Sequence, residues 1–196
     1  RRAARRRLVA HLSGERKLDP DIAGAIVAAA AIEGDATLYD RYVARMKESE
    51  TTDAQEEGRF RNGLTHFRDA ALAARMARDL FTDLIREQDR GLMLETMLGT
   101  IHGREQAWRA ARESWDAKIA TMDPGGKQRA IRAVAQLTPR TLASEAMAFL
   151  QAKRAPDTAE TTGQALERLR IVSAVAEQMS RELGDALEGV AERARA

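Results

Sequence analysis

The sequence predicts an all-α protein. Only 4% of its 196 residues are aromatic and only four are proline, whereas Ala, Arg, Leu and Glu, which are strong helix formers, are plentiful. Runs rich in Val, Ile and Thr, which would indicate strands, are absent from the sequence. Capping residues and glycines divide the chain into segments whose apolar residues recur at helical spacing. These observations predict about ten helices joined by short connections.

Five helices are predicted in the N-terminal part, and their ends are marked by capping residues, by proline at a first helical position or by glycine. The third shows the periodicity most clearly, because Leu38, Tyr39, Tyr42, Val43 and Met46 fall on one face. The end marks are, in chain order, Gly14 after Ser13, Asp19 with Pro20, Gly34, Asp35, Thr52 with Gln55 as a capping box, and Asp69.

Five further helices are predicted after residue 84. The last is long: its apolar residues from Ala165 to Leu183 repeat at alternating spacings of three and four, and Gly184 is a candidate interruption. The other marks are, in chain order, the polar break IREQDRG at 85–91 before a sixth helix carrying Leu94, Met97, Leu98 and Ile101, then Gly103, the seventh helix within 101–118, the turn MDPGG at 122–126, and Thr138 with Pro139.

The connections are short, so consecutive helices are expected to be antiparallel neighbours. Five helix–turn–helix pairs of roughly 35–40 residues fit an α–α superhelix, a HEAT- or ARM-like stack of antiparallel helix pairs. A compact helical bundle is the alternative, because no strict sequence repeat is present. We expect residues 1–196 to form a single helical domain.

Composition and charge exclude several classes of function. The chain has no cysteine, which excludes disulfides, thiol catalysis and cysteine-ligated metals, fits a reducing compartment and favours a cytoplasmic location. No apolar run reaches the ~20 residues that span a bilayer, so no membrane partner is expected. The net charge is +2, so no nucleic-acid partner is expected either. The basic cluster at the start is read as a solvated helix face and comprises Arg1, Arg2, Arg5, Arg6 and Arg7.

No motif of a metal or catalytic site is found. His11, His66 and His102 are too scattered for a local metal motif, and the HExxH pattern of helical zinc proteases is absent. A nucleophile elbow, a Walker loop and a dinucleotide fingerprint are also absent. We therefore predict no catalytic residue, metal ligand or cofactor site in this segment.

Two features of residues 86–115 admit more than one interpretation. Trp108 and Trp115 are seven positions apart, which places both indoles on one face of a helix, as a buried stripe rather than a platform for an aromatic ligand. The polar stretch REQDR at 86–90 is interpreted as an inter-helix turn, and in a stack of helix pairs such a turn can face a ligand or another domain. The favoured interpretation of this stretch is an ordinary solvated turn with Asp89 as an N-cap.

Several motifs resemble, in order, those of a known family. They are KLDPDIAGAIVAAAAIEGDATLYDRYVARMKESETTDAQEEGRF at 17–60, REQD at 86–89, GREQAW at 103–108, ESWD at 113–116, AMAFL at 146–150 and QALERLR at 164–170. This order resembles the C-terminal helical domain of zinc aminopeptidases of the aminopeptidase N and endoplasmic-reticulum aminopeptidase family, over about residues 5–175. Ser114 stands where that family usually has asparagine, and the tail after Arg170 lacks its common tryptophan.

The resemblance implies a fragment of a longer multidomain enzyme. In that family the zinc ligands and the catalytic glutamate belong to an upstream domain, and the helical domain covers the active site and controls the access of peptides whose N-terminal amino acids are removed. The implied partners are the upstream catalytic domain of the same chain and peptide substrates, and zinc would belong to the parent enzyme. Arg86, Gln88, Asp89 and Arg104 are the residues expected to face the substrate chamber or the neighbouring domain. The alternative function is a free-standing helical-repeat adaptor that binds protein segments.

Overall fold

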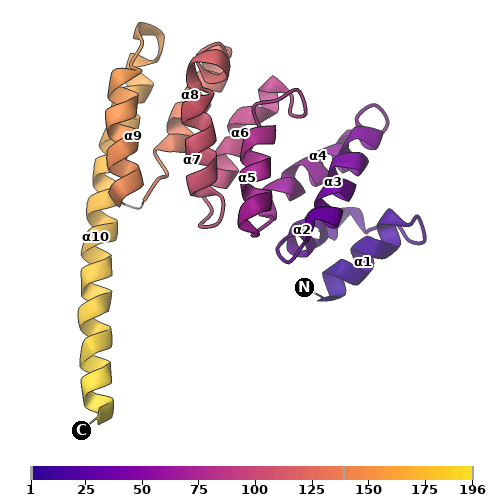
Figure 1. Ribbon diagram of the computed structural model, residues 1–196, viewed down its shortest axis with the longest axis horizontal. Coiled ribbons are helices and arrows are strands. Elements are labelled where there is room, and N and C mark those ends of the chain that lie inside the picture. The colour runs from indigo at the N-terminus through magenta and orange to yellow at the C-terminus, as the bar shows by residue number, and fades with distance from the viewer. Residues whose placement is uncertain (1, 139, 196) are drawn as a thin grey trace. The chain divides into compact units, whose positions relative to one another are not determined.

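The computed structural model describes residues 2–138 and 140–195, and the side chains of residue 189 and of residues 191–195 fall outside this description. All regular structure in the described residues is helical (Figure 1), so the predicted all-α class is confirmed. The chain divides into two compact units, Arg1–Ser114 and Trp115–Ala196. In the described part of the chain, none of the helices combines the length and the apolar character needed to cross a bilayer.

The first unit consists of packed helix pairs. Neighbours pack as α1 on α2, α3 on α4 and α6 on α7, and α2 also packs on α4 and α5 on α7. Tyr42 of α3 contacts Phe60 of α4, while Arg45, one turn later in α3, reaches back to Glu56, so this pair is antiparallel. The elements are α1 (Arg2–Leu12), α2 (Pro20–Ala31), α3 (Ala36–Ser49), α4 (Ala54–Gly63), the short η1 (Leu64–His66), α5 (Ala70–Asp79), α6 (Glu87–Leu98) and α7 (Arg104–Glu113).

The second unit is built on one long helix. α8 and α9 both pack on α10. Arg140, at the start of α9, pairs with Glu177, well along α10, so α9 and α10 are antiparallel. The elements are η2 (Trp115–Ile119), which is a π-type turn, α8 (Pro124–Val134), α9 (Arg140–Ala152), the short η3 (Pro156–Thr158) and α10 (Ala159–Arg195).

Aspartates open three of the helices as predicted. The side chains of Asp19, Asp35 and Asp69 accept hydrogen bonds from backbone N–H groups of the first turns of α2, α3 and α5, which is the N-cap interaction. The predicted capping box of Thr52 and Gln55 is wrong. Asp53 caps α4, because its carboxylate accepts from the N–H groups of Gln55 and Glu56, whereas the Thr52 hydroxyl donates backward to the carbonyl of Glu48. The predicted start of α9 at Thr138 and Pro139 falls partly on Pro139, which is outside the described residues.

Three other local predictions are corrected. The REQDR stretch is not an inter-helix turn, because α6 begins at Glu87, and Asp89 lies inside its first turn instead of capping it. Ile101 is exposed in the turn after α6 instead of lying on its buried face. Gly184 does not interrupt α10.

The two tryptophans are buried, as predicted, but they do not share one continuous helix. α7 ends at Glu113 with Ser114 as its C-cap, and Trp115 begins η2 in the second unit. Both indoles are nearly inaccessible to solvent. Trp115 packs edge-on against Phe149, with ring centroids 5.1 Å apart. Their role is packing.

An aromatic cluster forms the centre of the first unit. Tyr42 packs edge-on against both Phe60 and Phe67, at centroid separations of 5.0 and 5.4 Å, and Tyr39 contacts Phe67 at 5.2 Å. Such tilted contacts are the favoured geometry for aromatic pairs. The cluster joins α3 to α4 and to the segment that follows η1, and so it fixes the position of α4, which carries the polar features described next.

Candidate functional site

Two of the four predicted site residues belong to a closed ring of alternating charges between α4 and α6. We define the charge ring as Glu57, Arg61, Arg86 and Asp89. Arg61 Nη1 lies 2.6 Å from Glu57 Oε1 and 3.0 Å from Asp89 Oδ2. Arg86 completes the ring, with Nη2 3.2 Å from Glu57 Oε2 and Nε 2.9 Å from Asp89 Oδ2.

The members of the charge ring differ in burial. The side chains of Glu57, Arg61 and Asp89 are 7%, 13% and 16% exposed, whereas that of Arg86 is 46% exposed. The hydrogen bond that Arg86 donates to Asp89, together with the nearby charge of Glu57, raises the pKa of Arg86 above its ordinary value. A charged pair with little solvent access is held in one geometry. The charge ring therefore fixes the first turn of α6 against α4 while leaving part of the Arg86 guanidinium open to solvent.

The other two predicted residues lie outside the ring. Gln88 is exposed on the first turn of α6. Arg104 is half-buried at the start of α7, and its Nε donates a hydrogen bond to the carbonyl of Thr100, 3.0 Å away. Arg90, the last residue of REQDR, is buried and donates to the carbonyl of Thr82, so it supports the turn before α6.

Sequence reasoning missed Glu57 and Arg61. Their spacing of four residues was a signal, since acid and base at this spacing pair on one helix face. Nothing local indicated that the same two side chains reach Arg86 and Asp89. That information depends on how the fold places the start of α6 near α4.

The neighbouring residue, Glu56, forms a second polar cluster on another side of α4. It is buried, and His11 Nε2 lies 2.6 Å from its Oε1. Arg45 and Arg59 contact the same carboxylate at 3.1 and 3.5 Å. The N–H of Leu18 donates to His11 Nδ1, so the proton of a neutral imidazole lies on Nε2 and is donated to Glu56. This cluster connects α1, α3 and α4.

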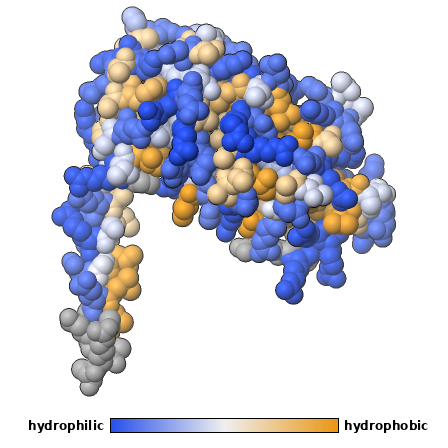
Figure 2. Space-filling model, viewed as in Figure 1, coloured by the Kyte–Doolittle hydropathy of each residue, from blue (hydrophilic) through white to orange (hydrophobic). Residues whose placement is uncertain are grey.

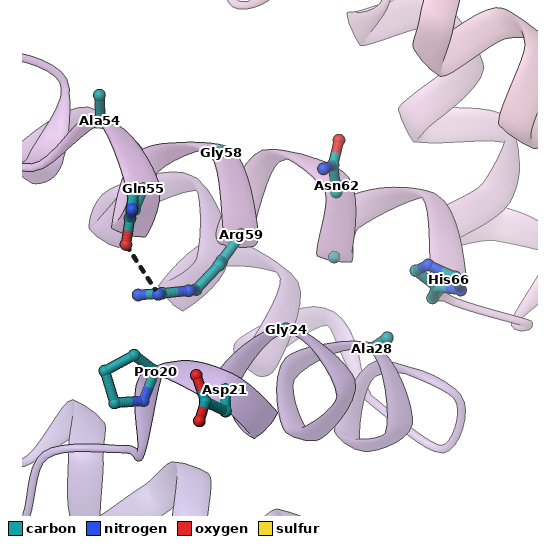
Figure 3. Close-up of a pocket in the computed structure, with 11 residues that line it drawn as sticks. Pro20, Asp21, Gly24, Ala28, Ala54, Gln55, Gly58, Arg59, Asn62 and His66 are labelled. Atoms are coloured by element: carbon teal, nitrogen blue, oxygen red, sulfur yellow. Dashed lines mark hydrogen bonds between the residues drawn. The ribbon is translucent and has the colours of Figure 1, made fainter.

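A groove of about 740 Å³ lies between α2 and α4. Figure 3 shows the Arg59 side chain along it, with a hydrogen bond of 3.2 Å from Nη2 to Gln55 Oε1. Gly24 and Gly58 leave room along its walls, since an added Cβ at Gly24 would meet nothing within 4 Å and one at Gly58 would meet only Arg61 Nη2, at 3.7 Å. Burial lowers the pKa of His66, which lines one end, so its imidazole is neutral near pH 7. Asp21 and Arg59 are the acid and the base among its lining residues, and the Arg59 guanidinium is already engaged by Gln55 and Glu56.

The described residues do not offer a zinc site. No group of three His, Asp or Glu side chains among them is placed to hold a metal ion. Both ring nitrogens of His11 are engaged, by Leu18 and by Glu56. In chemical terms, the charge ring and the Glu56 cluster hold helices together, and the exposed parts of Arg86 and Gln88 offer hydrogen-bond donors to a neighbouring surface.

Comparison with known proteins gives the family. The sequence model of the ERAP1-like C-terminal domain matches residues 1–171, and the chain belongs to this family. Aminopeptidase M1-B of Oryza sativa subsp. japonica is 29% identical over 124 residues, which are 62% of this chain and 14% of that protein. The chain thus spans a small part of the length of the relative that it matches. The resemblance to the C-terminal helical domain of aminopeptidases is confirmed.

Proposed function

We propose that this chain is the non-catalytic C-terminal helical domain of a zinc aminopeptidase, which covers the active site of an upstream catalytic domain and controls the access of peptides. The observation that carries the proposal is the family match over residues 1–171, almost the whole chain. The similarity to an aminopeptidase of which the matched segment is 14% supports a position within a much longer enzyme. The single domain over 1–196, as part of such an enzyme, remains our prediction.

Zinc and the reacting groups are assigned to the upstream domain. The described residues of this chain lack a cluster that fits zinc, and in the proposed enzyme the metal would supply an activated water for hydrolysis of the N-terminal peptide bond. This segment contributes by limiting which peptides reach that water. The absence of cysteine in the chain is consistent with a reducing compartment, and a cytoplasmic location is part of the proposal.

Within the segment, we assign the first turn of α6 to the surface that meets the substrate chamber or the catalytic domain. Arg86 and Gln88 are exposed there, and the charge ring holds Arg86 in a defined position. A preorganised guanidinium loses little freedom on binding and suits carboxylates and carbonyl oxygens. Arg104, at the start of α7, is assigned to the same role.

The test uses the full-length enzyme encoded by the gene. Arg86→Ala and Gln88→Ala are expected to change the ratio of kcat/KM for long and short peptides several-fold, while Arg109→Ala leaves this ratio unchanged. Arg109 is the matched control, because it forms an exposed pair with Glu105 on α7. Equal ratios in all variants would refute the assignment of this surface.

A second experiment tests the non-catalytic role itself. Residues 1–196 alone are expected to fold, to bind no stoichiometric zinc and to leave aminoacyl anilides uncleaved. Stoichiometric zinc, removed by a chelator together with activity, would refute the proposal. A coding sequence that encodes no catalytic domain upstream of Arg1 would instead favour the free-standing adaptor.

A further inference from the structure

The second unit has two apolar surfaces that the proposed function leaves unassigned. One is the outer part of α10, where Figure 2 shows hydrophobic side chains along one side of the helix. The other is a pocket of about 100 Å³ that is lined by residues of η2, α8, α9, η3 and the start of α10. Because the pocket has walls, it restricts the size and the charge of a ligand, which an open helix face does not.

The interior of this pocket is apolar. Trp115 is fixed by its edge-on contact with Phe149, and it belongs to a π-type turn, a local structure that is frequent at functional sites. An apolar cavity of about 150 Å³ holds benzene, so the smaller pocket here suits a branched aliphatic group of about four carbons. The apolar lining side chains that are at most 5% exposed are Trp115, Ile119, Ile131 and Leu150.

Charged side chains of both signs lie where the pocket opens to solvent. Lys127, Lys153 and Asp157 line it and are 22%, 32% and 51% exposed. Lys127 Nζ lies 2.6 Å from Asp157 Oδ2, and Lys153 Nζ lies 2.6 Å from Asp116 Oδ2. The hydrogen bond from Lys127 lowers the pKa of Asp157, so this carboxylate is ionised near pH 7. The mouth therefore presents a positive and a negative group side by side.

A buried hydroxyl also lines the pocket. Thr162, in the first turn of α10, is 2% exposed, and no described residue forms a hydrogen bond with its hydroxyl. Its neighbour Thr158, by contrast, donates to the carbonyl of Ala155. A buried polar group without a partner costs free energy, so the Thr162 hydroxyl favours a ligand that brings an oxygen atom.

The charged groups favour a zwitterion over a simple ion. An anion bound to Lys127 would also meet the carboxylate of Asp157, and a cation bound to Asp157 would meet the ammonium group of Lys127. A molecule that carries an ammonium and a carboxylate on one carbon gives each of these two side chains a partner of opposite charge. When its third substituent is a branched aliphatic group, such a molecule is a branched-chain amino acid.

We propose that this pocket binds a free branched-chain amino acid such as L-leucine. The carboxylate of leucine lies toward Lys127 and Thr162, and its ammonium group lies toward Asp157. Its isobutyl group lies against Trp115 and Ile131. In the enzyme that we propose above, free amino acids are the product, so the pocket would be a site of regulation by product. That role rests on the proposed function, whereas the binding itself does not.

Equilibrium dialysis of the full chain with radiolabelled L-leucine tests the proposal. We expect one saturable site per chain with a Kd on the order of 0.1 mM, which is within the range for a ligand of this size. Two analogues lack one charge each: 4-methylpentanoate lacks the ammonium group and 3-methylbutylamine lacks the carboxylate. Each should compete with leucine at least ten-fold more weakly. L-Tryptophan should not compete, because its indole is too large for the pocket.

Two variants test the assigned contacts. Asp157→Asn should weaken leucine binding at least ten-fold, because the ammonium group loses its counter-charge. Thr162→Val, which replaces the hydroxyl with a methyl group of similar size, should weaken it several-fold. Asp40→Asn is the matched control, since Asp40 is also an exposed carboxylate paired with a base, Arg75, but lies in the first unit, and this variant should bind leucine normally. Circular dichroism checks that every variant is folded.

Three outcomes would overturn the proposal. The first is the absence of saturable leucine binding up to about 10 mM. The second is equal affinity for leucine and 4-methylpentanoate, which would assign the pocket to simple carboxylates. The third is equal affinity of Asp157→Asn, Thr162→Val and the unmodified chain for leucine, which would place leucine elsewhere. Each of these results leaves the proposed control of peptide access intact, because that role is tested by the peptide-length ratios of the Arg86 and Gln88 variants.

Discussion

Arg86 Nη2 lies 3.2 Å from Glu57 Oε2, and this contact joins the first turn of α6 to α4 across 29 positions of sequence. Glu56, the residue before Glu57, is held on another side of α4 by His11, Arg45 and Arg59. Two adjacent buried carboxylates therefore connect α4 to bases of α1, α3 and α6 as well as to bases of α4 itself. Buried ion pairs add little net stability but are costly to break, so this arrangement specifies where α4 lies.

Removal of one arginine from the charge ring should lower stability by an amount that depends on how deeply that arginine is buried. Arg61→Ala leaves Glu57 and Asp89 close together with little solvent, and should lower the free energy of unfolding by about 3 kcal/mol. Arg86→Ala should cost less than about 1 kcal/mol, because Arg86 is half exposed. Urea unfolding followed by circular dichroism measures both.

The exposed pair on α7 is the control for this comparison. Arg109→Ala breaks a contact with Glu105 in which both side chains are more than 60% exposed and should change stability by only a few tenths of a kcal/mol. Equal losses for Arg61→Ala and Arg109→Ala would contradict the role given to the charge ring.

The helices themselves could be predicted from sequence because their signals are local. Asp19, Asp35 and Asp69 each accept hydrogen bonds from the N–H groups two or three residues later, so residue type and spacing suffice to place the helix start. The predicted start of α6 was wrong because this helix lacks such a local capping signal. Its N-cap, Arg86, makes no side-chain cap hydrogen bond, so the polar stretch read as a turn.

The candidate site could be predicted only in part. The REQD motif indicated Arg86 and Asp89, but the charge ring also needs Glu57 and Arg61, whose side chains reach the start of α6 only in the folded chain. The break between Trp108 and Trp115 was also hidden, because Ser114 and the π-type turn at η2 contain no proline or glycine to mark the end of α7. Contacts between residues distant in sequence form the charge ring.

The corrected cap of α4 gives a direct test. Asp53→Ala should destabilise the protein more than Thr52→Ala, because Asp53 accepts from two backbone N–H groups. The hydrogen bond from the Glu56 N–H lowers the pKa of Asp53 below its ordinary value of 3.8. The stabilisation that the Asp53 cap gives is therefore complete above about pH 3.8, and it is lost as the pH falls through the lower pKa of Asp53 in the folded state. Urea midpoints at neutral and acidic pH measure this, and a larger loss for Thr52→Ala would restore the capping box.

Gly63 should tolerate no side chain. A Cβ there would lie 2.6 Å from Val27 Cγ1 and 2.8 Å from Tyr42 Cε2, because the end of α4 packs closely on α2 and α3. Gly63→Ala should lower stability by about 1–3 kcal/mol through overpacking. Gly24→Ala, in the open part of α2, should instead raise stability by up to about 1 kcal/mol through helix propensity. Thermal unfolding of the two variants compares them, and a stabilised Gly63→Ala protein would show that this packing is looser than described.

Tyr39 should make stability depend on alkaline pH. Its hydroxyl donates to Asp79 Oδ2 at 2.9 Å, and burial, with the Asp79 charge, raises its pKa above the ordinary value of 10. Because the pKa of Tyr39 is raised in the folded state, the stabilisation from its hydrogen bond is complete below pH 10 and is lost as the pH rises further. Tyr39→Phe should lower the free energy of unfolding by about 1.5 kcal/mol near pH 7, and the stabilities of the variant and the unmodified protein should converge by about pH 11.

Tyrosinate absorbance gives the control: Tyr42, the other tyrosine, is also buried, and burial raises its pKa as well. Tyrosinate should therefore form only on unfolding, and its appearance in the folded chain near pH 10 would contradict the buried hydrogen bond.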